Sequence, residues 1–178
     1  MMPFREFFQD WLYGEDGYYA RYLPIGKKGD FYTSVTASSY FGGSIAWHLI
    51  HQIQHRILPE NTHVIEFGAH QGYLMTDIIQ FLHILAPHLL DTLSFTVIEQ
   101  FESLRSRQYE YFRTQLGHDH PIVQVADISE VEGEWAFILA NEIFDSFACD
   151  LLQNGRQAYV HDWKVHWASP EDKVAEVS

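Results

Sequence analysis

Short apolar runs alternate with amphipathic segments over the second two-thirds of the chain. Four β-branched or aromatic runs, each closed by a polar or glycine residue, predict buried strands at 62–67, 94–98, 121–126 and 135–140. Helical spacing of apolar residues predicts helices between the first three runs, at 72–85 and 102–116. Strands that alternate with helices are typical of a parallel, doubly wound α/β sheet with right-handed crossovers.

The two ends of the chain have different patterns. The spacing of apolar residues predicts a helix over 3–13, and a second helix that begins near 36–39 and ends at about 57. A glycine- and aromatic-rich loop joins them. Asn154-Gly155 predicts a hairpin between residues 151–153 and 157–161. We therefore expect an N-terminal helical extension over 1–60, an α/β core over 61–150, and a hairpin with a tail over 151–178.

Length, charge and cysteine content narrow the class of protein. The chain has 178 residues, enough to bury a core without disulfides, and a formal net charge of −13 with only 11 Lys and Arg. This charge argues against nucleic acid as a partner. The single cysteine, Cys149, excludes an internal disulfide and a cysteine-based zinc site. Neither a signal peptide nor a membrane-spanning run is apparent, so we expect a cytoplasmic protein.

Residues that can form hydrogen bonds lie at the end of every predicted strand. These residues are Glu66 with Gly68, Glu99, Asp127, and Asn141 with Glu142. In open α/β sheets the ligand binds beyond the carboxyl ends of the strands. The sequence therefore predicts a binding site that several carboxylates line, although an acidic residue in such a place is also a common helix cap.

The loop after the first strand argues against phosphate binding. His70 stands where the dinucleotide fingerprint needs its second glycine, and no Lys-Ser or Lys-Thr pair follows Gly72 as in a P-loop. Carboxylates without a phosphate cradle suit a ligand with hydroxyls and a cationic amine, such as S-adenosylmethionine. Glu99 would accept hydrogen bonds from the ribose hydroxyls, Asp127 would contact the adenine amino group, and Glu66 would face the ammonium. Another nucleotide-binding enzyme is the weaker alternative.

Four stretches of the sequence resemble the MidA-like family of S-adenosylmethionine-dependent methyltransferases, whose mitochondrial members assist the assembly of respiratory complex I. The Gly-Asp-Phe-x-Thr-Ser and Ala-Asn-Glu-x-x-Asp motifs are the most specific of them. The stretches lie at 12–19, at 29–34 with Phe41-Gly42, at 65–75 leading to 97–108, and at 140–147.

The resemblance implies a Rossmann-like class I methyltransferase sheet preceded by helices, with S-adenosylmethionine as cofactor. It places Asp30, Thr33 and Ser34 over the cofactor, although Thr33 or Ser34 could instead cap the next helix. Family members are implicated in dimethylating an arginine of a partner protein. If this carries over, Asn141, Glu142 and Asp145 are the catalytic candidates, with the two carboxylates orienting a guanidinium.

The sequence departs from the family in two ways. His70-Gln71 replaces small residues of the glycine loop, which would affect cofactor affinity. Only the first four parallel strands and one hairpin are present, so the chain appears truncated. The alternative function is therefore a non-catalytic interaction or assembly module, with the exposed sheet edge forming a homo-oligomer. No metal site is expected, because no Glu lies between His51 and His55 to complete a hydrolase motif.

Overall fold

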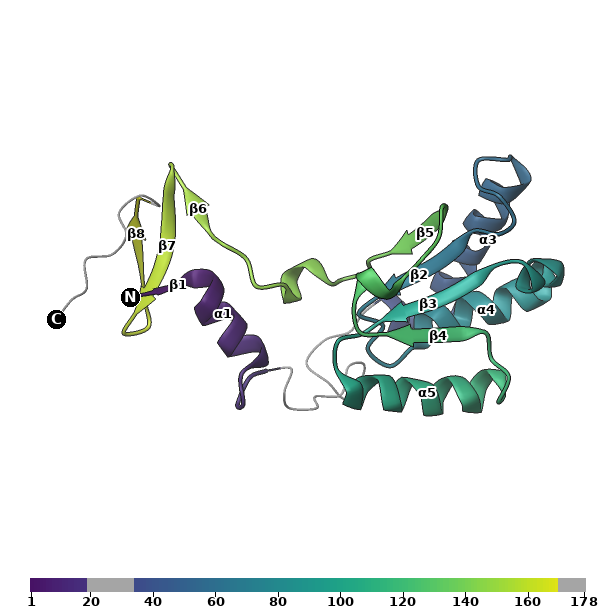
Figure 1. The fold of residues 1–178 in the computed structure, drawn as a ribbon, viewed down its shortest axis with the longest axis horizontal. Coiled ribbons are helices and arrows are strands. Elements are labelled where there is room, and N and C mark those ends of the chain that lie inside the picture. Colours follow the sequence, from purple (N-terminus) through teal and green to yellow (C-terminus); the bar gives the residue numbers. More distant parts are fainter. Residues whose placement is uncertain (19–33, 170–178) are drawn as a thin grey trace. The chain divides into compact units, whose positions relative to one another are not determined.

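The computed structural model describes residues 1–18 and 34–169. The described residues form two compact units (Figure 1). One takes in both ends, residues 1–18 and 144–169, and the other comprises residues 34–143. The helical extension predicted over 1–60 is thus divided between the two units. The segment 19–33, with Asp30 and Thr33, lies outside the described residues.

The larger unit contains the predicted parallel sheet. Its strands are β2 (His63–Phe67), β3 (Ser94–Ile98), β4 (Ile122–Val125) and β5 (Ala136–Leu139). They lie in the order β4-β3-β2-β5, and all neighbours are parallel. The order reverses beside β2, because β3 pairs with one of its edges and β5 with the other. The α/β sheet predicted from the apolar runs is confirmed, and each strand agrees with its run to within one residue at either end.

The α-helices of this unit pack on one face of the sheet. They are α3 (Tyr40–Gln54), α4 (Tyr73–Leu85) and α5 (Glu102–Leu116). The helix predicted from 36–39 to about 57 is α3, which ends three residues earlier, and the separate short helix α2 (Ser34–Ala37) precedes it. The core contains every second residue of the strands, including Val64, Phe95 and Val97, with apolar residues of the helices. This pattern fixes which face of the sheet is buried against the helices.

No α-helix of the described residues covers the opposite face of the sheet. Val123 of β4 and Ile138 of β5 lie on that face, and each is 58% exposed. Helices on both faces, as in a doubly wound sheet, are therefore not found in the described part of the chain. The connection from β4 to β5 contains only η2 (Ile128–Glu130), while η1 (Pro87–Asp91) follows α4.

The smaller unit joins the two ends of the chain. It comprises β1 (Met2–Pro3), α1 (Phe4–Tyr13), η3 (Phe144–Ser146), β6 (Leu152–Gln153), β7 (Arg156–His161) and β8 (Lys164–Ala168). The predicted hairpin is confirmed in β6 and β7, and β7 also pairs antiparallel with β1 and β8. The Tyr13 hydroxyl donates a hydrogen bond to the Ser146 carbonyl at 2.8 Å. Within the described ranges, no helix is long and apolar enough to span a membrane.

Close packing of α3 on α4 gives the first testable prediction. A Cβ added to Gly42 would lie 2.5 Å from the Asp77 Cβ, which is too close for any real contact. We expect Gly42→Ala to lower the free energy of unfolding by about 1–3 kcal/mol, because the helices must move apart. Helix propensity alone would raise it by about 1 kcal/mol. Urea unfolding of Gly42→Ala therefore distinguishes close packing from helix propensity by the sign of the change in the free energy of unfolding. Ser44→Ala, on the exposed face of α3, is the control.

Candidate functional site

The carboxyl ends of the central strands lie level with one another. Phe67 pairs with Ile98, and Ile98 pairs with Val125. The backbone N–H of Gly68 donates to the Ile98 carbonyl at 2.9 Å, and the N–H of Glu99 donates to the Val125 carbonyl at 3.0 Å. The residues predicted to bind a ligand after β2, β3 and β4 therefore start from one edge of the sheet.

The loop from β2 to α4 makes its turn with left-handed residues. Gly68 has a φ of 62° and Gly72 a φ of 82°. His70 also has a positive φ, at 46°, a conformation that is uncommon for a residue with a side chain. Gly72 packs so closely against the Phe112 ring that a Cβ would overlap it. The two glycines are thus required by geometry, whereas His70 adopts a strained backbone between them.

The side chain of Gln108 holds this loop against α5 and β4. Gln108 is fully buried. Its Nε2 donates to the His70 carbonyl at 3.1 Å, and its Oε1 accepts a hydrogen bond from Gln124 Nε2 at 2.8 Å. It also makes a side-chain hydrogen bond with Glu99. The sequence analysis did not single out Gln108 as a site residue. A polar residue at a core-facing position of an amphipathic helix is the signal that could have found it.

Glu66 is a buried carboxyl group with an unused oxygen. It lies on the helix-covered face of β2, is 5% exposed, and hydrogen-bonds with the Met75 backbone. Its Oε2 has no hydrogen-bond partner among the described residues. Burial raises the pKa of Glu66 from 4.5 to about 8. A cationic group next to Oε2 would favour the ionised form and satisfy the unpaired atom, which suits the predicted contact with an ammonium.

Glu99 and Asp127 differ in their surroundings. Glu99 is 6% exposed, and burial raises its pKa despite hydrogen bonds with Phe101 and Gln108. Asp127 is exposed and caps η2, where its side chain accepts a hydrogen bond from the Ser129 N–H at 2.8 Å. The hydrogen bonds with Ser129 lower the pKa of Asp127. Asp127 therefore has the capping role weighed above, and its contact with an adenine stays a prediction.

The residues that follow β5 are only partly brought together. Glu142 has a φ of 52°, and its Oε1 accepts hydrogen bonds from the backbone N–H and the hydroxyl of Ser34, at 3.4 and 3.2 Å. Asn141 is half-buried beside it. Asp145 is exposed and belongs to the smaller unit, so the structure does not pair it with Glu142. The predicted carboxylate pair remains a prediction.

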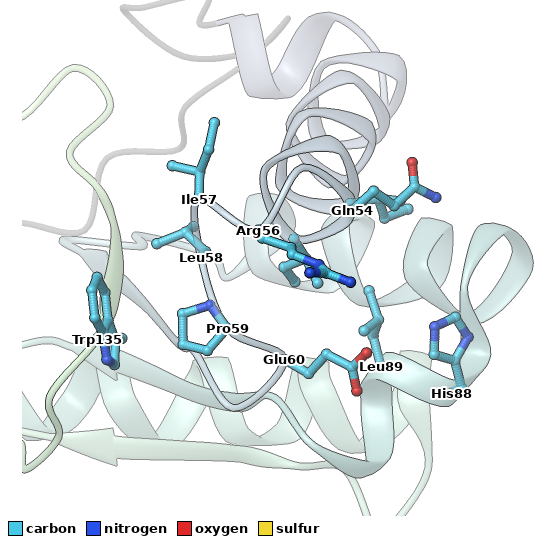
Figure 2. A pocket seen from close by; sticks show the side chains of 11 residues that line it. Gln54, Arg56, Ile57, Leu58, Pro59, Glu60, His88, Leu89 and Trp135 are labelled. Carbon is cyan, nitrogen blue, oxygen red and sulfur yellow. The ribbon is translucent and has the colours of Figure 1, made fainter.

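A solvent-open pocket of about 520 Å³ lies at the amino ends of the strands, away from these residues. Figure 2 shows Arg56, Glu60 and His88 along one side and Pro59 and Trp135 along the other. None of the predicted site residues lines it. Ligands of open α/β sheets bind at the carboxyl ends instead, so we do not assign the cofactor to this pocket. In the described ranges, no group of three or more His, Cys, Asp and Glu could hold a metal ion.

Comparison with known proteins identifies the family. Residues 44–177 match the model of a family described as "Putative S-adenosyl-L-methionine-dependent methyltransferase" (Methyltransf_28). The chain belongs to this family. The match includes all four parallel strands and the loop 68–72, and thus every residue of the site described above except Ser34.

Two crystal structures from Burkholderia thailandensis share the fold. One is a COG1565 superfamily member, described as a "likely methyl transferase", bound to S-adenosyl-homocysteine; it is 22% identical with a TM-score of 0.70. The other is an uncharacterized protein of the same superfamily, 21% identical with a TM-score of 0.64. Each match covers 94% of this chain but only 45% and 43% of the respective relative. The chain thus spans less than half the length of either relative.

The buried carboxyl group of Glu66 predicts a dependence of stability on pH. Its folded pKa of about 8 lies above its ordinary value of 4.5, so the folded state holds a proton that the unfolded state releases between these pH values. Its contribution to stability is present at low pH and is lost as the pH rises toward 8. We expect Glu66→Gln to become more stable than the wild type by up to about 1.4 kcal/mol per pH unit over this range.

Urea unfolding at pH 5 and pH 8 measures this difference. The Gln variant keeps the shape of the protonated carboxyl group, so the two proteins should have similar stability at pH 5. An equal change of stability with pH in both proteins would mean that Glu66 does not titrate in this window.

Proposed function

We propose that this chain binds S-adenosylmethionine at the carboxyl ends of β2 and β3 and forms the cofactor part of a methyltransferase. The observation that carries the proposal is the pair of buried carboxyl groups at adjacent strand ends, Glu66 with an unpaired Oε2 and Glu99 beside Gln108. Both have a pKa that burial raises. A ligand that carries both a cationic group and a pair of hydroxyls would supply hydrogen-bonding partners for these two carboxyl groups. Family membership and the S-adenosyl-homocysteine in the relative support the choice of cofactor.

Each residue has a distinct task in this proposal. Glu66 faces the ammonium, Glu99 accepts hydrogen bonds from the ribose hydroxyls, and the exposed side of Asp127 contacts the adenine. Gly68 and Gly72 let the loop turn around the ligand, and the Gln108 hydrogen bonds hold that loop in place. When bound, the cofactor supplies an electrophilic methyl group on its sulfonium. The main work of the protein is then to hold the acceptor in line with that methyl group.

We extend the proposal to an arginine side chain of a partner protein as the methyl acceptor. Arginine is protonated in water, so its nitrogen must lose a proton as it attacks. Ser34 donates two hydrogen bonds to Oε1 of Glu142, and we assign Oε2 to orienting a guanidinium or accepting that proton. Asn141 and Asp145 would assist. The resemblance to the MidA-like family supports this choice of acceptor.

A second candidate function is a non-catalytic interaction module. Exposed apolar residues on the two outer strands favour it, because Ile138 of β5 and Val123 of β4 are exposed and β5 forms one edge of the described sheet. A second copy of the chain pairing along β5 would cover this edge. Light scattering tests this candidate. We expect a dimer in the wild type, and we expect a charged residue in place of Ile138 to dissociate it.

Calorimetric titration with S-adenosylmethionine and S-adenosyl-homocysteine tests the cofactor proposal. We expect micromolar binding that Glu99→Ala weakens by at least tenfold, or about 1.4 kcal/mol. Glu60→Ala removes the same charge at the opposite end of the sheet and serves as the matched control. Absence of binding at millimolar cofactor, or equal weakening in both variants, contradicts the proposal.

A further inference from the structure

A strip of aromatic residues surrounds one carboxylate on the outer surface of the helices. Tyr73, Asp77 and Phe81 follow one another on α4 at a spacing of four residues, which places them along one face of the helix. Tyr111 of α5 flanks the strip on one side, and Tyr40 of α3 flanks it on the other. We call these five residues the aromatic strip.

The packing of three helices fixes the geometry of the aromatic strip. The rings of Tyr73 and Tyr111 meet edge to face, with centroids 5.0 Å apart and an interplanar angle of 68°. The rings of Tyr40 and Phe81 lie 6.3 Å apart. Between these two pairs, Asp77 rests against Gly42 of α3, whose lack of a side chain allows the close approach. Asp77 therefore sits between two pairs of rings.

The carboxylate of Asp77 has no hydrogen-bond or ion-pair partner among the described residues. The side chain is half-buried. Burial raises the pKa of Asp77 from 3.8 to about 6. Burial, and after it the charge of Asp77, raises the pKa of Tyr111. At neutral pH the carboxylate is ionised and partly removed from water, and no described residue supplies a cation that offsets this cost.

We propose that Asp77, Tyr73 and Tyr111 form a binding site for the basic side chain, Arg or Lys, of a partner polypeptide. A cation placed here pairs with the carboxylate and lies against the tyrosine rings, and both contacts are strengthened by the partial burial. Phe81 and Tyr40 extend the apolar contact along α4 for the residues next to the basic side chain. The net charge of −13 attracts a basic segment to this surface.

This site is separate from the proposed cofactor site. The aromatic strip begins at Tyr73, one residue after Gly72, but it lies on the outer surface of the helices and contains none of the residues assigned to the cofactor. It does not rest on methyltransferase activity, and it predicts binding whether or not S-adenosylmethionine is present.

Titration of the ¹⁵N-labelled protein with a blocked Ala-Arg-Ala peptide, followed by NMR, tests the site. We expect saturable shifts at residues 73, 77 and 111, and an affinity at least fivefold lower in Asp77→Asn. A matched control is Asp91→Asn, which removes the same charge from an exposed position on η1 and should change the affinity less than twofold. Tyr111→Phe keeps the ring and should bind more tightly than Tyr111→Leu.

Three results would overturn the proposal. They are shifts that do not saturate, equal binding of an Ala-Gln-Ala peptide, and equal loss of affinity in Asp91→Asn and Asp77→Asn. The NMR spectrum of each variant also reports whether the fold is intact, so loss of binding through unfolding is distinguished from loss of the site.

Discussion

The hydrogen bonds of one buried amide, that of Gln108, connect three parts of the proposed cofactor site. This side chain donates to the carbonyl of the loop after β2, accepts from Gln124 on β4, and bonds with Glu99 after β3. A buried amide costs free energy unless its donors and acceptor are all used, so its partners must stay in position. Backbone hydrogen bonds between the strands align their ends, and the Gln108 side chain holds the loops that follow β2 and β3.

The same region carries groups that oppose stability. Glu66 and Glu99 are buried acids with raised pKa values, and His70 has a left-handed backbone. An apolar residue at either acidic position would fit the core at lower cost. Strain and buried charge gathered at one edge of a sheet are typical of a binding site, because a ligand can supply the missing partners. The pocket beside Trp135 has one left-handed residue, Arg56, but no buried acid among the described residues that line it.

The sequence predicted the elements whose signal is local. Strand 94–98 and helix 102–116 agree with the structure to the residue, because the apolar run is closed by Glu99 and Gly117 ends the helix. Features that depend on distant residues were not predicted. Pairing of β1 with β7 joins the two ends of the chain, and the role of Gln108 depends on partners from two other elements. The structure shows Asp127 in the capping role that the sequence allows as one of its two interpretations, and the adenine contact stays a prediction.

We propose that the ligand binds where the carboxyl ends of β2 and β3 meet. A crystal structure of this chain with S-adenosyl-homocysteine tests this proposal most directly. We expect the amino group of the ligand next to Glu66, its ribose hydroxyls on Glu99, and the loop 68–72 around it with the Gln108 bonds intact. Density for the ligand in the pocket beside Trp135, at the opposite end of the sheet, would contradict it.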